Sequence, residues 1–89
     1  MLKQNASATY KKDLKRCAKR GYDLSKLNEV VDTLLIPAPL DEKHKDHLLS
    51  GDHVGHRECH ITPDWLLEYI IDDEELYLIR TGTHSDIFG

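Results

Sequence analysis

The sequence contains no long apolar run, and the residues up to Asp13 include no apolar stretch of signal-peptide length. A helix needs about 18 to 20 apolar residues to cross a membrane, and a secretory leader needs a shorter apolar core behind a basic start. The sequence therefore predicts neither a membrane-spanning nor a secreted protein. We expect a cytoplasmic protein with no membrane partner.

Cysteine, glycine and proline are also scarce. The two cysteines, Cys17 and Cys59, have no close-spaced partners, which excludes a disulfide framework and a four-cysteine zinc site. We expect two reduced, partly buried thiols. Five glycines and three prolines, beside 39% hydrophobic residues, exclude a disordered or low-complexity segment. The length of 89 residues predicts one domain, spanning residues 1–89.

The charges are unevenly distributed along the chain. The formal net charge is −4, which on its own argues against a nucleic-acid partner. Residues 1–20, however, carry seven basic residues against Asp13 alone, a net charge of +6, and the rest of the chain carries −10. Two interpretations of the basic segment stay open. It is either the solvated face of an amphipathic helix or a surface that attracts phosphates or an acidic partner.

Two helices are predicted in the N-terminal half. Apolar residues recur at helical spacing over residues 10–18 and again over residues 27–35. Gly21 ends the first helix and Pro37 ends the second. Candidate N-caps are Ser7 or Thr9 for the first helix, and Asp23 or Ser25 for the second. The short connection predicts an antiparallel helical hairpin.

Three strands are predicted in the C-terminal half, at residues 53–61, 65–71 and 76–81, where branched and aromatic residues replace the helical pattern. Tight turns between them predict an antiparallel meander. The stretch over residues 37–46 is typical of a surface loop, and residues 1–5 only weakly indicate a further edge strand. We therefore expect an α+β fold in which the helical hairpin covers one face of a small antiparallel sheet.

Five of the six histidines lie within residues 44–60. An imidazole accepts and donates protons near neutral pH, so several on one surface suit acid–base catalysis. In a strand, His56, Glu58 and His60 share one face, and the turn that follows brings Asp64 close to His60. The simplest alternative is a set of exposed polar histidines with no catalytic role.

Zinc binding is a second alternative for the histidines. His56 and His60 have an H-x3-H spacing, and His53 is nearby. That spacing places two ligands together on a helix, whereas this segment is predicted to be a strand, and no cysteine pair completes a tetrahedral set. The sequence therefore favours no metal ion and no cofactor.

Several C-terminal motifs resemble those of the YafQ branch of the RelE-type bacterial toxins. They are Lys45-Asp46-His47, Gly55-His56-Arg57-Glu58-Cys59-His60, Pro63-Asp64-Trp65-Leu66-Leu67, and Arg80-Thr81-Gly82-Thr83-His84-Ser85 with Phe88. The resemblance covers about half of the chain by motif, and all of it by length and element order. It implies a small antiparallel sheet covered by an N-terminal helical hairpin. It also implies a ribosome-dependent mRNA endonuclease held inactive by a cognate antitoxin.

The resemblance further implies roles for individual residues. The positions that match the cleavage site of the family are His47, His60, Asp64 and His84. The positions expected to bind RNA are Lys45, Trp65, Arg80 and Phe88, and the basic first helix is expected to contact ribosomal RNA. Without the resemblance, Trp65 is interpreted as a core residue.

A metal-independent cleavage fits these residues. RNA carries its own nucleophile, the 2′-hydroxyl, so the protein needs a base, an acid and positive charge near the phosphorane. We expect His47 or His60 as the base, His84 as the acid, and Asp64 as the partner of a histidine or a contributor to the acid role.

Three residues depart from the family pattern: His53 stands where an aromatic residue is common, His56 adds an imidazole, and Glu68 interrupts an apolar strand. A glutamate in a half-buried strand faces solvent or needs a partner. The alternative function is a non-catalytic interaction module that binds an acidic partner through its basic helix.

Overall fold

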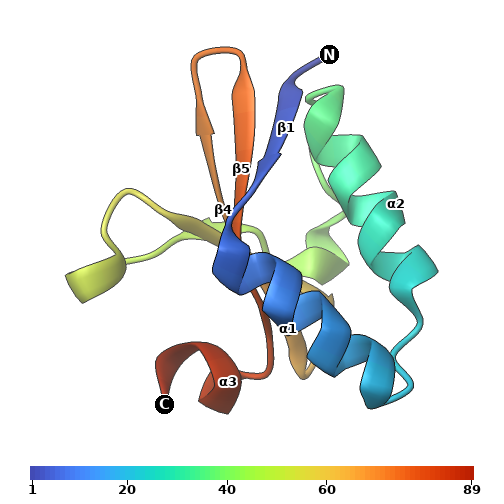
Figure 1. Ribbon diagram of the computed structural model, residues 1–89. Coiled ribbons are helices and arrows are strands. Elements are labelled where there is room, and N and C mark those ends of the chain that lie inside the picture. Colours follow the sequence, from blue (N-terminus) through green and yellow to red (C-terminus); the bar gives the residue numbers. More distant parts are fainter.

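The computed structural model describes residues 1–89. It contains a five-stranded sheet in the order β1-β5-β4-β3-β2, with three α-helices around it (Figure 1). The strands are β1 (Lys3–Ala6), β2 (His47–Leu48), β3 (Arg57–Thr62), β4 (Trp65–Asp72) and β5 (Glu75–Gly82). The helices are α1 (Ala8–Lys19), α2 (Leu24–Leu35) and α3 (His84–Phe88), and two 3-10 turns are η1 (Glu42–His44) and η2 (Gly51–His53).

The two N-terminal helices begin at residues that cap them. The Ser7 hydroxyl accepts a hydrogen bond from the Tyr10 backbone N–H at 2.9 Å, and the Asp23 carboxylate accepts one from Ser25 at 3.1 Å. Gly21, with φ of +80°, ends the first helix as predicted. None of the helices has the length and apolar character that a membrane span requires.

The predicted meander is confirmed, but the sheet is mixed. Strands β3, β4 and β5 pair antiparallel in sequence order. Strand β1, only weakly indicated by the sequence, pairs parallel with β5 and makes the sheet mixed instead of antiparallel. The first predicted strand also starts too early, because Gly51 and Gly55 have positive φ and residues 51–53 form η2. Strand β2 and helix α3 were not predicted from the sequence.

The sheet has two different faces. One face packs against α1 and α2 through an apolar core that includes Cys59, Leu67, Tyr69 and Leu78. Both cysteines are free, as predicted, but they are fully buried and not partly buried.

The opposite face carries polar residues in register. His47 on β2 pairs with Glu58 on β3, Glu58 pairs with Glu68 on β4, and Glu68 pairs with Arg80 on β5. Directly paired residues project from the same face of a sheet. Helix α3 and the segment around η2 lie on the side of the sheet away from α2 (Figure 1). This face therefore gathers the histidine-rich segment and the C-terminus.

Candidate active site

Three histidines from distant segments lie together on the polar face. The ring centroids of His47 and His60 are 6.5 Å apart, and those of His60 and His84 are 6.1 Å apart. They come from β2, β3 and the first residue of α3, respectively. An RNA phosphate in this space would be within reach of more than one imidazole, as acid–base catalysis requires.

Backbone carbonyls fix the orientation of two of these rings. The Nδ1 atom of His47 lies 2.6 Å from the Lys45 carbonyl oxygen, and that of His60 lies 3.2 Å from the Pro63 carbonyl oxygen. A carbonyl oxygen only accepts, so each Nδ1 donates the hydrogen. In the neutral ring this leaves Nε2 as the atom that takes up a proton.

The Nε2 atoms of both rings face Glu58. They lie 3.6 Å (His47) and 3.9 Å (His60) from its Oε1 atom. Glu58 is only 2% exposed, and its Oε2 atom has no hydrogen-bond partner. A carboxylate at this distance stabilises a protonated imidazole. Strand periodicity places Glu58 on the same face as His60, but Glu58 was not predicted to be a site residue.

Helix α3 holds His84 in place through its first turn. The Thr83 hydroxyl and the Asp86 carboxylate form a capping box. Asp86 also accepts two hydrogen bonds from the Arg20 guanidinium, at 2.6 and 3.0 Å. These bonds hold the pKa of the Asp86 carboxyl well below its usual range. The end of α1 thus fixes the helix that carries His84.

Arg80 lies beneath α3 and is already paired. Its Nε and Nη2 atoms donate to the buried carboxylate of Asp13 at 2.7 and 3.2 Å, and Nη2 also donates to the Asp86 carbonyl at 3.0 Å. The hydrogen bonds that Arg80 donates to Asp13 raise the pKa of the Arg80 guanidinium. The Nη1 atom takes part in none of these bonds, so it is the atom left for the expected phosphate contact.

Phe88 lies on the histidine surface. It is 41% exposed, and its ring centroid is 5.9 Å from His84 and 4.9 Å from His53. Lys45, with φ of +48°, is exposed beside His47. Both placements are compatible with the RNA contacts expected from the resemblance.

Trp65 is buried in the core, whereas Asp64 is exposed at a turn. Trp65 is 3% exposed, packs against Tyr22, and donates its indole N–H to the Thr81 hydroxyl at 2.8 Å. The burial leaves no ring face for an RNA base, and the interpretation as a core residue is confirmed. Asp64 is exposed at the β3–β4 turn, where it lines a small pocket with Tyr22 and Lys26, and it forms no hydrogen bond with His60. Its catalytic role stays a prediction.

A second glutamate on this face also lies between two histidines. The Nδ1 atom of His53 lies 2.9 Å from Glu68 Oε2, and the Nδ1 atom of His56 makes a short contact with the same oxygen. Glu68 is 1% exposed, so the predicted need for a partner is met by two imidazoles. His53, His56 and Glu68 were recognisable from the sequence as departures from the family pattern, but their proximity was not predicted.

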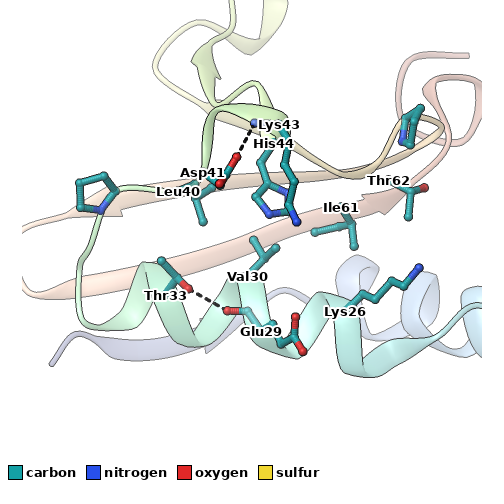
Figure 2. A pocket seen from close by; sticks show the side chains of 12 residues that line it. Lys26, Glu29, Val30, Thr33, Leu40, Asp41, Lys43, His44, Ile61 and Thr62 are labelled. Atoms are coloured by element: carbon teal, nitrogen blue, oxygen red, sulfur yellow. Dashed lines mark hydrogen bonds between the residues drawn. The ribbon is translucent and has the colours of Figure 1, made fainter.

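A pocket of about 500 Å³ lies apart from the histidine surface. Figure 2 shows Lys26 and Glu29 of α2 on one side of it, and Ile61 and Thr62 of β3 on the other. His44, the only histidine in its lining, donates from Nδ1 to the His60 carbonyl at 2.6 Å. The pocket does not include the three clustered histidines.

Helix α1 divides its basic residues between two uses. Arg16 and Arg20 make ion pairs with Asp13 and Asp86. The other basic residues of the helix, Lys11, Lys12, Lys15 and Lys19, are exposed and make no ion pair. The two arginines of the basic segment thus stabilise the fold, whereas its four lysines on α1 form a free cationic surface.

Comparison with known proteins gives the family. Residues 2–89 match the family described as bacterial toxin of type II toxin-antitoxin system, YafQ. The chain is 45% identical to the mRNA interferase toxin YafQ of Escherichia coli K12 over 85 residues, which cover 93% of this chain and 91% of that protein.

Solved structures agree with this family assignment. A copper-bound mutant toxin from Helicobacter pylori superposes with a TM-score of 0.95 at 45% identity, covering 99% of this chain and 100% of that one. The toxin in the E. coli DinJ-YafQ complex superposes with a TM-score of 0.92 at 37% identity, covering all of both chains. The fold predicted from the resemblance is confirmed, with a mixed sheet. The chain belongs to the YafQ family of toxins of type II toxin-antitoxin systems.

Proposed function

We propose that this protein is an mRNA-cleaving toxin that acts on translating ribosomes and is neutralised by a cognate antitoxin. The observation that carries the proposal is the convergence of His47, His60 and His84 on one surface, with two of the rings oriented by backbone carbonyls. Family membership supports the same conclusion, because the E. coli relative is an mRNA interferase.

The proposed reaction uses the 2′-hydroxyl of the RNA as nucleophile. Nε2 of His47 or His60 removes the 2′-hydroxyl proton, the 2′-oxygen attacks phosphorus, and the bond from phosphorus to the 5′-oxygen breaks. His84 donates a proton to the departing 5′-oxygen, which gives a 2′,3′-cyclic phosphate and a 5′-hydroxyl. Arg80 and Lys45 would stabilise the developing negative charge. No step in this scheme requires a metal ion.

Phe88 is proposed to hold an unstacked base beside His84. Aromatic side chains commonly hold single-stranded RNA in this way, and the ring is accessible. The exposed lysines of α1 would contact ribosomal RNA. The ribosome would then supply most of the surface that positions the mRNA, which suits a protein of 89 residues.

The antitoxin is proposed to be a small protein that binds this chain in a stable complex. The E. coli relative has been solved in complex with DinJ, described as its antitoxin. A protein that cleaves cellular mRNA must be produced with such an inhibitor. The non-catalytic alternative would use the exposed lysines of the same basic helix, but it has no need of three histidines on one surface, so the convergence of His47, His60 and His84 favours cleavage.

Expression in a bacterium without the cognate antitoxin tests the proposal. Wild-type protein should arrest growth and produce new mRNA 5′ ends within translated regions. His84→Ala should lower the cleavage rate at least about 100-fold, the lower limit for losing a general acid or base. Equal arrest and equal cleavage by both proteins would overturn the assignment of His84.

A matched histidine variant controls for the loss of an imidazole. His44→Gln changes a histidine outside the cluster, and the glutamine amide can still donate to the His60 carbonyl. We expect this variant to keep the wild-type pattern of mRNA ends. Thermal unfolding of each purified variant, in complex with the antitoxin and after its removal, shows whether a loss of cleavage reflects a loss of folding.

A further inference from the structure

We propose that His53, His56 and Glu68 form a binding site for one divalent transition-metal ion of the zinc class. The three side chains lie beside the His47, His60 and His84 cluster and take no part in the cleavage scheme. Their candidate ligand atoms all lie within 4.8 Å of one another. Two imidazoles and one carboxylate are a ligand set that zinc accepts, with a further position left for water.

The geometry needs little change to hold an ion. Both Nδ1 atoms already converge on one carboxylate oxygen, Oε2 of Glu68. Zinc bonds of about 2.0 to 2.2 Å keep the ligands of one ion within about 4.4 Å of each other. Small outward movements of the two rings would therefore place the ion where the two Nδ1 hydrogens now lie. Each ring would then carry its remaining proton on Nε2.

Glu68 is the strongest indication that the site takes a ligand. The residue lies in the middle of β4, is 1% exposed, and its Oε1 atom is buried without any hydrogen-bond partner. A buried carboxylate oxygen without a partner costs free energy. Its neighbour across the ladder is Glu58, another buried carboxylate, and like charges directly opposite are unfavourable. A divalent cation coordinated by Glu68 would offset both costs.

The backbone holds the two histidines ready for an ion. The His56 N–H donates to the His53 carbonyl at 3.0 Å, and the Leu49 N–H donates to the His56 carbonyl at 2.9 Å. Gly55, with φ of +90°, makes the tight turn between the two histidines. Strand β4 is paired on both sides, so Glu68 is fixed as well. A site built on such fixed elements loses little entropy on binding.

The other group of two histidines and a glutamate is a poorer metal site. The His47 and His60 Nε2 atoms lie 3.6 and 3.9 Å from Glu58, and the Nδ1 atom of each ring is occupied by a backbone carbonyl. The more open arrangement leaves space for a phosphate between the rings. The two groups therefore suit different ligands, although they lie on adjacent strands.

Metal binding would also affect the C-terminus. The His53 ring meets the Phe88 ring edge to face at a centroid distance of 4.9 Å. An ion that fixes His53 would therefore restrict Phe88, the aromatic residue proposed to hold the RNA base. The site connects the segment around η2, strand β4 and the end of α3.

Zinc titration of the metal-free protein tests the proposal. Competition with a chromogenic chelator should show one Zn²⁺ bound per chain of wild type. His53→Gln, His56→Gln and Glu68→Gln should each weaken zinc binding more than 10-fold, since even partners behind the ligands contribute 10- to 100-fold. His47→Gln, from the more open group, is the matched control and should bind zinc as wild type does.

Two further measurements keep the test independent of folding and of RNA cleavage. Unfolding temperatures measured without metal show whether each variant folds. Zinc should raise the unfolding temperature of wild type and of His47→Gln, but not that of the three ligand variants. Nitrogen NMR of the imidazoles should show zinc on Nδ1 of His53 and His56, together with a shift of the Phe88 ring signals. Absence of zinc binding by wild type, equal binding by all variants, or loss of binding in His47→Gln alone would each overturn the proposal.

Discussion

At the scale of single residues, the backbone decides what each imidazole of the cleavage cluster can do. The Lys45 and Pro63 carbonyls hold Nδ1 of His47 and His60 as donors, so Nε2 is the atom that the proposed reaction assigns to proton exchange with RNA. The asparagine amide can still donate to these carbonyls, but asparagine has no nitrogen in the place of Nε2. A histidine-to-asparagine change at either position should therefore preserve folding better than it preserves cleavage.

The thiol of Cys59 should be unreactive in the folded protein. Burial raises its pKa to about 12, and only the thiolate is strongly nucleophilic. Cys17 is also fully buried. We expect no reaction with a thiol reagent at pH 8 in native conditions, and two reactive thiols per chain in denaturant. Rapid labelling of the native protein, counted by mass spectrometry, would contradict the buried placement.

The carboxylate of Asp86 should make the stability depend on pH in acid. Its folded-state pKa is lowered, chiefly by Arg20, so its contribution is complete above the unfolded pKa of about 3.9 and is lost as the pH falls through the folded pKa. Asp86→Asn should therefore cost about 1 kcal/mol of unfolding free energy at pH 7. Urea unfolding at pH 7 and pH 3 should show the difference from wild type shrinking at the lower pH. A constant difference would contradict the ion pair.

At the scale of elements, the short helix α3 sets the positions of His84 and Phe88. Gly82 precedes it with φ of +150°, and a Cβ atom there would lie 2.7 Å from Asp86 Oδ2. That carboxylate cannot move away freely, because it belongs to the capping box and to the pair with Arg20. The absence of a side chain at Gly82 therefore lets Asp86 cap α3 and so helps to position His84.

Gly82→Ala should consequently reduce cleavage more than it reduces stability. The added methyl group displaces Asp86, frees the start of α3 and moves His84 away from His60. Gly21→Ala is the matched control, since Gly21 also has positive φ but has nothing within 4 Å of the new Cβ atom. The control should cost about 1 kcal/mol of stability and keep its cleavage rate per folded molecule. A similar rate for both variants would mean that α3 does not position His84.

Regular elements were predictable from the sequence where local signals are strong. The capped, amphipathic helices and the three-stranded meander follow from residue spacing and turn residues. Strand β2 has only two residues, and α3 has only five, which is too short for a periodic pattern. Strand β1 pairs parallel with β5, which is distant in the sequence, and a local residue pattern cannot predict such a pairing. Glu58 and Glu68 were recognisable as strand residues, but only the register between β3 and β4 brings them side by side.

At the scale of the whole molecule, the distribution of charge matters more than its sum. The net charge of −4 would disfavour RNA, yet the exposed lysines of α1 form a cationic surface. Acidic residues lie elsewhere, including the β4–β5 turn at residues 72–75. The formal charge is therefore a poor guide to the partner of this protein.

Neutralising two lysines of α1 should weaken ribosome binding. We expect the double variant Lys11→Gln and Lys15→Gln to bind ribosomes less tightly and to reduce the salt dependence of binding by about one unit of log–log slope per lysine. Lys3→Gln with Lys26→Gln removes the same charge outside the helix and is the control. Equal losses in both double variants, measured by sedimentation at several salt concentrations, would argue against α1 as the ribosome-facing surface.

The chemistry of the RNA ends tests the central claim most directly. Purified wild-type protein should cleave mRNA on translating ribosomes to a 2′,3′-cyclic phosphate and a 5′-hydroxyl. It should retain this activity after its own bound metal is removed and the chelator is washed away, so that ribosomal magnesium is undisturbed. A single 2′-deoxy substitution at the cleavage position should block the reaction. Cleavage of that deoxy-substituted mRNA, or fragments that carry a 5′-phosphate, would contradict the account.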